Sequence, residues 1–525
     1  MCYSGPRLLF LLSVIWGASI FWIAPRPPMV DFPQHAGQVA LLRDLAAGSS
    51  PWSSLFQINL FTPYLVGYGL ALPFSFFMPV GAAIKLVFSA AYVAFVWALV
   101  RLRKHFKADP RLDWFFLLSF FGISYYWGFF TFLTAAPIAI MFILVADRYA
   151  QEPSLKRGMA TTLLGIVLLA SHGLMFVFGF AVAGILYTVR CCSVRPWAGR
   201  WLRHLWPFVI AGLACLVYFL VSTRLQAQYG GIGNAGPVIW NWNWSWSWKR
   251  PVKIFIDSLG GKTDIPLLVT AFILPLIPWM LGLRIDRNRP ATWVMFAFTF
   301  LIALTLPVFA MATGLLYIRF ALFILPAYAL MFTLPRPDAP RQVIPGSASA
   351  QAVPMAERIA MPLMIAVTWL MLGQHSLHAW RFAGEARDFE AVLASMQPAQ
   401  RALSLPFAQR SEAANNDYAY LHFGTWYQSE KQGLVDFNFA WLPPQIARFR
   451  PDRLPAVTYG FEHSPRDFNW HKHHGENYRY FLVRHSEPLS PDLFRGADCA
   501  PAQVLASGAW TLLERQDCHA VSAMK

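Results

Sequence analysis

Long apolar runs recur along the chain, and they constrain the fold more than any other feature. A helix of ~20 apolar residues crosses a bilayer, and about eleven such runs occur, near 8–24, 60–77, 80–100, 113–130, 131–147, 160–187, 206–222, 265–283, 291–311, 317–334 and 359–374. Hydrophobic residues make up 56% of the 525 residues and charged residues only 13%, against roughly 25% charged in soluble domains. We therefore predict an α-helical polytopic membrane protein.

The net charge of +16 is concentrated in short loops between the apolar runs. This pattern indicates membrane orientation and argues against nucleic-acid binding. The connections that contain Arg190, Arg284 and Arg336 are predicted to be cytoplasmic by the positive-inside rule. With an odd number of spans, the N-terminus is then cytoplasmic and the C-terminal domain periplasmic, in a bacterial inner (plasma) membrane.

Two basic loops, 101–107 and 148–157, do not fit this count, because they fall on the outer side. Either a span is miscounted or the rule is locally broken. The least certain stretch is 113–147, in which Tyr125, Tyr126, Trp127 and Gly128 form either a hairpin tip or a kink within the membrane.

Two domains are predicted from the change in composition near residue 374. Residues 1–374 form the transmembrane domain, with exported loops at 25–58 and 223–264. Residues 375–525 carry charges, prolines and strand-like runs at 401–405, 456–461 and 478–484, which predicts a small extracytoplasmic α/β domain. Cys499 and Cys518 share this domain, and a disulfide between them is one expectation in an oxidising compartment.

The segment after the first apolar run is the main candidate for chemistry. A proline-rich exit at 25–28 ends the first helix, and Asp31 and His35 follow at the start of a new helix that runs to Gly48. Asp31 has two interpretations, a general base or a helix cap worth ~1 kcal/mol. His35 could share the proton, bind a phosphate or have no role. One face of the new helix is expected to lie on the membrane surface.

Two ionisable residues lie inside or beside apolar runs, where charge is costly and often functional. His172 falls within the run 160–187 and is either a structural hydrogen-bond partner or a contact of the site. Arg319 opens the run 317–334 on the outer side, where it could bind a phosphate or extend to the interface.

The loop 222–264 alternates tryptophan with Asn or Ser from Trp240 to Trp248. This alternation suits an aromatic belt at the interface or an aromatic platform for a sugar or an isoprenoid tail. We count as substrate-binding candidates Arg319, His172, Tyr229, Trp242, Trp244, Lys249 and Arg250.

Several common motifs are missing from the sequence. It has no phosphate-binding Walker motif, dinucleotide fingerprint, HExxH or GxSxG. The histidines at 471, 473 and 474 are spaced too tightly for a tetrahedral zinc site. We assign no certain cofactor or metal ligand and leave a divalent cation open.

The layout resembles the GT-C superfamily of polytopic membrane glycosyltransferases, which use polyprenyl-phosphate sugars. The resemblance rests on Asp31 in the first exported loop, the helix after it, the second long exported loop (222–264) and the C-terminal domain. The family usually shows a pair of acids in the first loop, where this chain has Asp31-x-Pro33-x-His35.

This resemblance implies sugar transfer from a lipid-linked donor to an extracytoplasmic acceptor, an envelope glycan or lipid, with Asp31 as the base. His35 is our own addition to the catalytic residues. The other expected partners are membrane lipids, and nucleic acid is not expected. Two alternatives stay open: a transporter or flippase for a lipid-linked or anionic substrate, and a non-catalytic envelope assembly protein.

Overall fold

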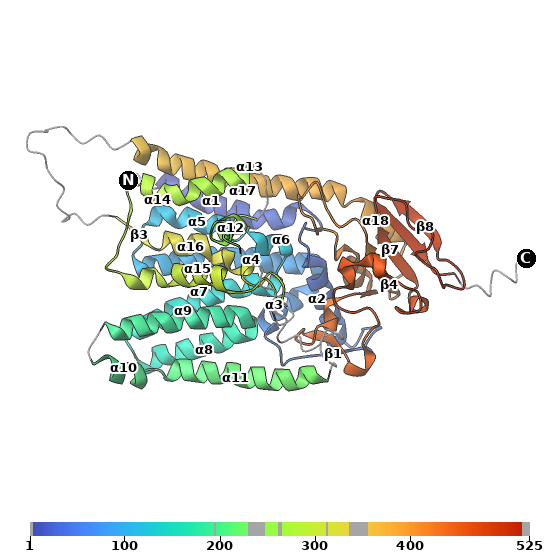
Figure 1. Ribbon diagram of the computed structural model, residues 1–525, viewed down its shortest axis with the longest axis horizontal. Helices are drawn as coiled ribbons and strands as arrows, with labels where there is room; N and C mark the ends of the chain where they lie inside the picture. Colours follow the sequence, from blue (N-terminus) through green and yellow to red (C-terminus); the bar gives the residue numbers. More distant parts are fainter. Residues whose placement is uncertain are drawn as a thin grey trace, which may run out of the picture.

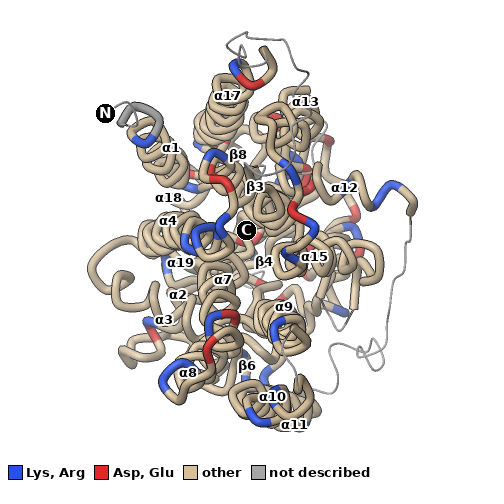
Figure 2. The backbone as a smooth tube through the Cα atoms, turned by 90° about the vertical axis from the view of Figure 1, so that its left-hand side faces the viewer, with Lys and Arg blue, Asp and Glu red and all other residues tan. Residues whose placement is uncertain are grey.

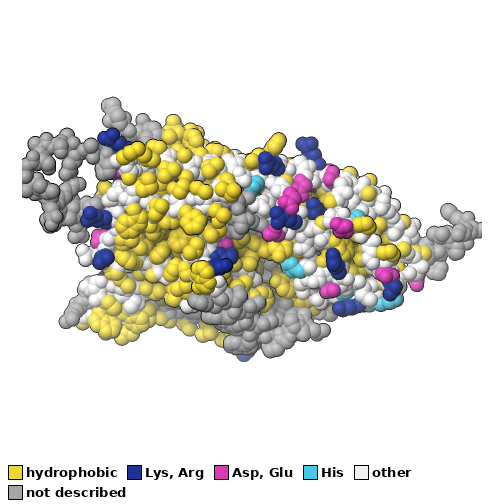
Figure 3. Space-filling view, turned by 45° about the horizontal axis from the view of Figure 1, so that its top comes forward, with side chains coloured by type: hydrophobic (Ala, Val, Ile, Leu, Met, Phe, Trp, Pro, Cys, Tyr) yellow, Lys and Arg dark blue, Asp and Glu magenta, His cyan; other side chains and the backbone are white. Residues whose placement is uncertain are grey.

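The computed structural model describes residues 4–193, 196–228, 247–260, 265–310, 313–334 and 355–516. Apolar helices run side by side through the left part of Figure 1, and a smaller domain with a sheet lies at their right-hand end. Hydrophobic side chains cover most of the visible face of the helical part, whereas charged and polar side chains dominate the smaller domain (Figure 3). The fold is therefore that of a helical membrane protein with a polar C-terminal domain.

Five of the described helices are long and apolar enough to cross a membrane: α4 (Val80–Phe106), α7 (Phe130–Gln151), α9 (Gly173–Cys192), α11 (Trp206–Ala227) and α17 (Met355–Glu385). Shorter helices complete this part: α1 (Ser4–Ile23), α2 (Phe32–Ala46), α3 (Leu65–Ser75), α5 (Phe115–Ser119), α6 (Ile123–Trp127), α8 (Leu155–Ser171), α10 (Trp197–Arg203), α12 (Arg250–Asp257), α13 (Ile265–Ile273), α14 (Ile277–Met280), α15 (Val294–Thr305) and α16 (Ile324–Ala329). A 3-10 helix, η5 (Ile318–Phe323), precedes α16.

Two of the predicted spans are wrong. The run 60–77 contains only α3, which does not cross the bundle. Before α3, Asn59 contacts the C-terminal domain. After it, Lys85 at the start of α4 donates to the Ala24 carbonyl at the end of α1, so the chain is still at the end of the bundle near that domain. The run 160–187 is not one span, because α8 and α9 pack against each other as a hairpin. Every loop between these two runs therefore lies at the opposite end of the bundle from the one that the count of spans predicts.

This change of side removes the conflict between the basic loops. The end of α4 contacts the loop before α15, because Arg289 donates to the Phe106 carbonyl. Arg200 donates to the Ala150 and Gln151 carbonyls at the end of α7. Figure 2 views this end of the bundle, opposite the C-terminal domain, and shows Lys and Arg at several of the helix ends. The loops 101–107 and 148–157 thus lie at the same end as Arg190 and Arg284.

The stretch 113–147 forms a hairpin, which confirms one of the two alternatives for it. Gly128 ends α6 in the left-handed conformation (φ 72°). The chain then reverses into α7. The turn also holds the segment after α1, since Val30 and Asp31 donate their backbone N–H groups to the carbonyls of Tyr126 and Trp127.

The C-terminal domain is built on a mixed sheet of five strands in the order β5-β4-β7-β9-β8. Its strands are β4 (Arg401–Pro406), β5 (Leu434–Asp436), β7 (Tyr480–Arg484), β8 (Ala502–Ser507) and β9 (Trp510–Glu514). β4 runs parallel to β5 and β7, while β9 is antiparallel to β7 and β8. The helices α18 (Asp388–Ser395) and α19 (Trp426–Lys431) complete this domain.

Two of the three strand-like runs of the C-terminal domain are strands, because β4 and β7 cover 401–405 and most of 478–484. The prediction of a strand at 456–461 is wrong, since turns and a short 3-10 helix occupy these residues. Cys499 is disulfide-bonded, and Cys518 lies outside the described residues.

The helix α2 is confirmed, but its expected place on the membrane surface is wrong. Most of its residues are buried, because it packs against α3 and α4 on one side and α19 on the other. Gln34 and Gln38 accept hydrogen bonds from the backbone N–H groups of Phe439 and Ala447 in the C-terminal domain. After α2, β1 (Phe56–Ile58) pairs with β6 (Ala447–Phe449) of that domain. The segment between α1 and α3 is thus enclosed between the two parts of the protein.

Candidate functional site

Asp31 stands at the N-terminus of α2, but its side chain makes no capping hydrogen bond. It is buried, with 8% of its surface exposed. Within the described residues its nearest charged or titratable neighbour is His422, whose Nε2 atom lies 3.5 Å from Oδ1. The capping interpretation therefore fails, and the buried carboxylate faces His422 at the junction of the two domains.

The pKa of Asp31 is raised from 3.8 to about 7. Burial is the main cause, because removing a carboxylate from water disfavours its charged form. The positive charge of Arg319 opposes the rise, and the negative charge of Glu462 adds to it. A carboxyl group that titrates near neutral pH has the affinity for a proton that a general base needs.

His422 belongs to the C-terminal domain and is held from both sides. Its Nδ1 atom lies 3.2 Å from the Gln34 side-chain nitrogen on α2, and its Nε2 atom faces Asp31. Burial lowers its pKa to about 3, so the imidazole is neutral at pH 7. It can therefore hydrogen-bond to the Asp31 carboxyl group without pairing with it as a cation.

Glu462 brings a second carboxylate close to Asp31. It is 6% exposed and accepts a hydrogen bond of 3.0 Å from the Gly460 backbone N–H. Burial raises its pKa to about 7. The junction thus contains two buried carboxyl groups whose pKa values are both raised to about 7, although the segment 25–58 supplies only one of them.

His35 lies on the first turn of α2 and is buried. Its Nδ1 atom is 2.7 Å from the hydroxyl group of Tyr68, which in turn donates to the Gln445 side-chain oxygen at 3.1 Å. Burial, assisted by the positive charge of Arg319, lowers its pKa to about 3. A neutral His35 is suited to positioning Tyr68 and is poorly suited to binding a phosphate as a cation.

Arg319 lies at the start of η5, at the end of the bundle that faces the C-terminal domain. Its guanidinium carbon is 3.6 Å from the centre of the Phe129 ring, and its Nε atom donates to the Gly314 carbonyl at 3.2 Å. It interacts electrostatically with Asp31 and Tyr64. It forms no ion pair within the described residues, so its positive charge is available to a ligand.

His172 is not inside a span, because it separates α8 from α9 at the tip of their hairpin. Its Nδ1 atom accepts a hydrogen bond from the Leu174 backbone N–H at 3.2 Å and so caps α9. Its ring lies 5.4 Å from that of Tyr64, and the charge of Arg319 acts on it. The structure thus brings Asp31, His35, His172 and Arg319 to one region.

The loop of tryptophans is only partly described, since Tyr229, Trp242 and Trp244 lie outside the described residues. Lys249 precedes α12, with its amine 5.7 Å from the Trp248 ring. Arg250 is buried, donates to the Leu306 carbonyl at 2.8 Å and stacks on Tyr317 at 4.3 Å. Its guanidinium already has protein partners, and a role in binding substrate stays a prediction for both basic residues.

No three His, Cys, Asp or Glu side chains in the described part of the chain are arranged to hold a metal ion. This includes the histidine run, in which His473 instead accepts a hydrogen bond from the Asn469 backbone N–H at 3.0 Å.

Four side chains of this region were not predicted from the sequence: Tyr64, Tyr68, His422 and Glu462. Histidines and glutamates in a polar domain carry no signal of burial. A partial clue lay in the Tyr64 and Tyr68 spacing, because residues four apart share one face of a helix.

Comparison with known proteins supports the fold. No protein-family model and no curated protein matches the sequence. Among solved structures, the chain is similar to ArnT from Cupriavidus metallidurans, crystallised with undecaprenyl phosphate, at a TM-score of 0.56 and 12% identity over 98% of both chains. It also matches arabinofuranosyltransferase AftD from Mycobacteria at a TM-score of 0.48 and 14% identity, over 97% of this chain and 40% of that one.

The chain therefore has the fold of a multi-pass membrane protein similar to ArnT, and the resemblance predicted from the sequence is confirmed at the level of the fold.

Proposed function

We propose that the protein is a membrane glycosyltransferase that moves a sugar from a polyprenyl-phosphate donor to an acceptor on the outer face of the membrane. The single observation that carries the proposal is Asp31, a buried carboxylate that caps no helix, has a pKa raised to about 7 and lies within the electrostatic reach of Arg319, which forms no ion pair with any residue that the structure describes. The fold shared with ArnT, which was crystallised with undecaprenyl phosphate, supports a lipid-linked donor.

In this proposal Asp31 removes the proton from an acceptor hydroxyl or amine. The acceptor atom then forms a bond to the anomeric carbon of the sugar, and the bond from that carbon to the lipid phosphate breaks with its electron pair. Arg319 stabilises the negative charge on the departing polyprenyl phosphate, because a guanidinium binds phosphate oxygens in a bidentate geometry. Asp31 finishes protonated and returns the proton to water.

The neutral residues around Asp31 have positioning roles in this proposal. His422 orients the carboxyl group from the C-terminal domain, and His35 orients Tyr68. Tyr229, Trp242, Trp244, Lys249 and Arg250 remain candidates for binding the lipid-linked donor, and His172 for lining the entrance beside Arg319.

The distribution of basic loops supports an orientation. Because Lys and Arg gather at the end of the bundle opposite the C-terminal domain (Figure 2), the positive-inside rule places that end, with the N-terminus, in the cytoplasm. The C-terminal domain and the site are then periplasmic, in an inner membrane. A donor on a lipid carrier cannot leave the bilayer, which suits a site at the boundary between the membrane helices and the outer domain.

The proposal is tested with the purified full-length protein in liposomes that contain polyprenyl phosphates bearing a radiolabelled sugar. We expect the label to leave the lipid and unlabelled polyprenyl phosphate to accumulate when an acceptor hydroxyl or amine is supplied. If the label crosses the membrane while still attached to its lipid, the protein is a carrier and the proposal fails. If neither the label nor the lipid changes with any donor or acceptor of a broad panel, the proposal also fails.

A further inference from the structure

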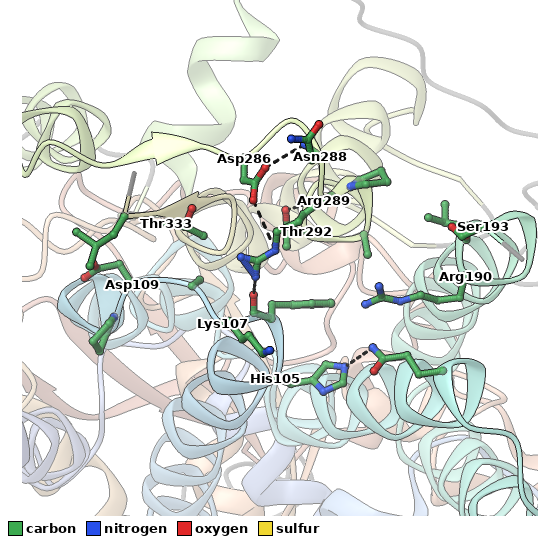
Figure 4. Close-up of a pocket in the computed structure, with 18 residues that line it drawn as sticks. His105, Lys107, Asp109, Arg190, Ser193, Asp286, Asn288, Arg289, Thr292 and Thr333 are labelled. Carbon is green, nitrogen blue, oxygen red and sulfur yellow. Dashed lines mark hydrogen bonds and ion pairs between the residues drawn. The ribbon is translucent and has the colours of Figure 1, made fainter. Parts of the chain in front are cut away.

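Figure 4 shows a polar cavity of about 720 Å³. It lies at the end of the bundle opposite the C-terminal domain. It is bounded by the final residues of α4 and α9 and by the segment 286–292 before α15. The helix α9 separates this cavity from the proposed transfer site, because Arg190 lies roughly 27 Å along the helix from His172 at 1.5 Å per residue. The two sites are therefore distinct.

Basic side chains outnumber acidic ones around the cavity. Lys107, Arg190 and Arg289 line it together with His105. Its two acidic residues are already engaged. Asp109 pairs with Arg111 at 3.0 Å, while Asp286 accepts a hydrogen bond from the Asn288 backbone N–H and lies 4.0 Å from Arg289.

A buried carboxylate behind the cavity holds its wall in place. Asp147 is fully buried and accepts hydrogen bonds from three residues that line the cavity. Its partners are His105 at 2.6 Å, Arg190 through Nε and Nη2 at 2.9 Å each, and Gln151 at 2.8 Å. The third nitrogen of Arg190, Nη1, makes no hydrogen bond within the described residues. The arginine is thus fixed in position with one donor group to spare.

Lys107 and Arg289 form the opposite side. Arg289 donates to the Phe106 carbonyl, which fixes it at the end of α4. Lys107 ends α4 in the left-handed conformation, with φ 52°. It is exposed and forms no ion pair with any described residue. Left-handed backbone at a residue other than glycine is strained, and such strain clusters at functional sites.

We propose that this cavity binds a phosphate group, carried by an anionic lipid headgroup or by a soluble phosphate compound. Arg190 supplies a pre-positioned planar donor and Lys107 a mobile point charge, a combination suited to phosphate oxygens. Basic pockets between membrane helices at the cytoplasmic side bind anionic headgroups. The inference does not depend on the proposed transfer reaction, since it rests on the other end of the molecule.

The test measures thermal unfolding of the full-length protein in neutral detergent, because a ligand of the folded state raises the unfolding temperature. One arm adds sodium phosphate at constant ionic strength, and the other adds dioleoylphosphatidylglycerol, with dioleoylphosphatidylcholine as the uncharged comparison. We expect at least one phosphate probe to raise the unfolding temperature of the wild-type protein. Stabilisation by phosphatidylglycerol alone identifies a lipid headgroup, and stabilisation by inorganic phosphate identifies a soluble ligand.

The variants Lys107→Gln and Lys107→Gly both remove the positive charge. Glycine adopts the left-handed conformation without strain, so a folding defect does not explain weaker phosphate binding by Lys107→Gly. Each should weaken binding about ten-fold, the value of one charge-assisted hydrogen bond. Lys156→Gln, at an exposed lysine of the same end outside the cavity, should bind as the wild-type protein does. Equal affinity in the wild-type protein and both Lys107 variants, or no stabilisation by either probe, would overturn the proposal.

Discussion

The Nε2 atom of His422, in the C-terminal domain, lies 3.5 Å from the Oδ1 atom of Asp31, which follows the first membrane helix. Neither domain alone forms the candidate site, because the carboxylate comes from one and its nearest titratable neighbour from the other. Arg26 strengthens the same junction by pairing with Glu390 and Glu430, both of the C-terminal domain. The position of the C-terminal domain therefore sets the environment of Asp31.

The rate of transfer should depend on pH through Asp31. Because its pKa is raised to about 7 and the base must be deprotonated, kcat/KM should rise about ten-fold per pH unit below 7 and level off above it. The same shift should lower the free energy of unfolding as the pH rises from about 4 to 7. In that window the unfolded chain has lost a proton that the folded protein retains.

Replacing Glu462 by Gln should move this pH profile. The negative charge of Glu462 raises the pKa of Asp31, so its removal should shift the midpoint of kcat/KM to lower pH, while the amide still accepts the Gly460 hydrogen bond. Glu487→Gln, at an exposed glutamate of the same domain, serves as the control. An unchanged midpoint in the Glu462 variant would show that the two carboxyl groups do not interact.

Substitution of Arg319 should weaken binding of the lipid-linked donor. Loss of a charge-assisted bond of 1.5–3 kcal/mol predicts a KM for the donor at least about ten-fold higher in Arg319→Gln, with Arg319→Lys in between. The pH midpoint should also move upward, because Arg319 lowers the pKa of Asp31. Arg224→Gln, at an exposed arginine of α11, should change neither value. A normal KM in Arg319→Gln would remove this residue from donor binding.

Gly128→Ala should disturb the segment that holds Asp31. Gly128 has φ 72°, and an added Cβ would lie 2.9 Å from the Met29 Cβ and 3.2 Å from the Phe32 nitrogen. Gly48 has nearly the same conformation, φ 68°, with nothing within 4 Å. Gly48→Ala should therefore cost only the ~1–2 kcal/mol of left-handed backbone, whereas Gly128→Ala should cost more in thermal unfolding and lower the transfer rate. Equal losses in the two variants would contradict this account of the turn.

The structure and the sequence-based count of spans place the loop 148–157 on opposite sides of the membrane. An epitope tag inserted between Glu152 and Pro153 should bind antibody only after the inner membrane is permeabilised, because this loop lies at the end opposite the C-terminal domain. A tag between Asp452 and Arg453 should bind antibody in intact spheroplasts. Exposure of the first tag in intact spheroplasts would contradict the proposed orientation.

Asp31 and Arg319 could be selected from the sequence because charge beside apolar runs is rare and costly. His422 and Glu462 could not, because they lie in polar stretches of the C-terminal domain, and the sequence there does not indicate that the junction with the membrane helices buries them. Hydropathy also could not separate α3, a short helix that does not cross the bundle, from a span. Nor could it reveal the break at His172, where a capping hydrogen bond, rather than a proline, separates two apolar helices.

The most direct test of the central claim is the rate of sugar transfer by the Asp31→Asn variant in liposomes with a lipid-linked donor. Because the Asp31 side chain caps no helix and Asn carries no charge to bury, the variant should insert and be at least as stable as the wild-type protein, while the rate falls by about 10²–10⁴-fold. Asp452→Asn, at an exposed aspartate of the C-terminal domain, should keep the full rate. Wild-type transfer by Asp31→Asn would contradict the assignment of Asp31 as the base.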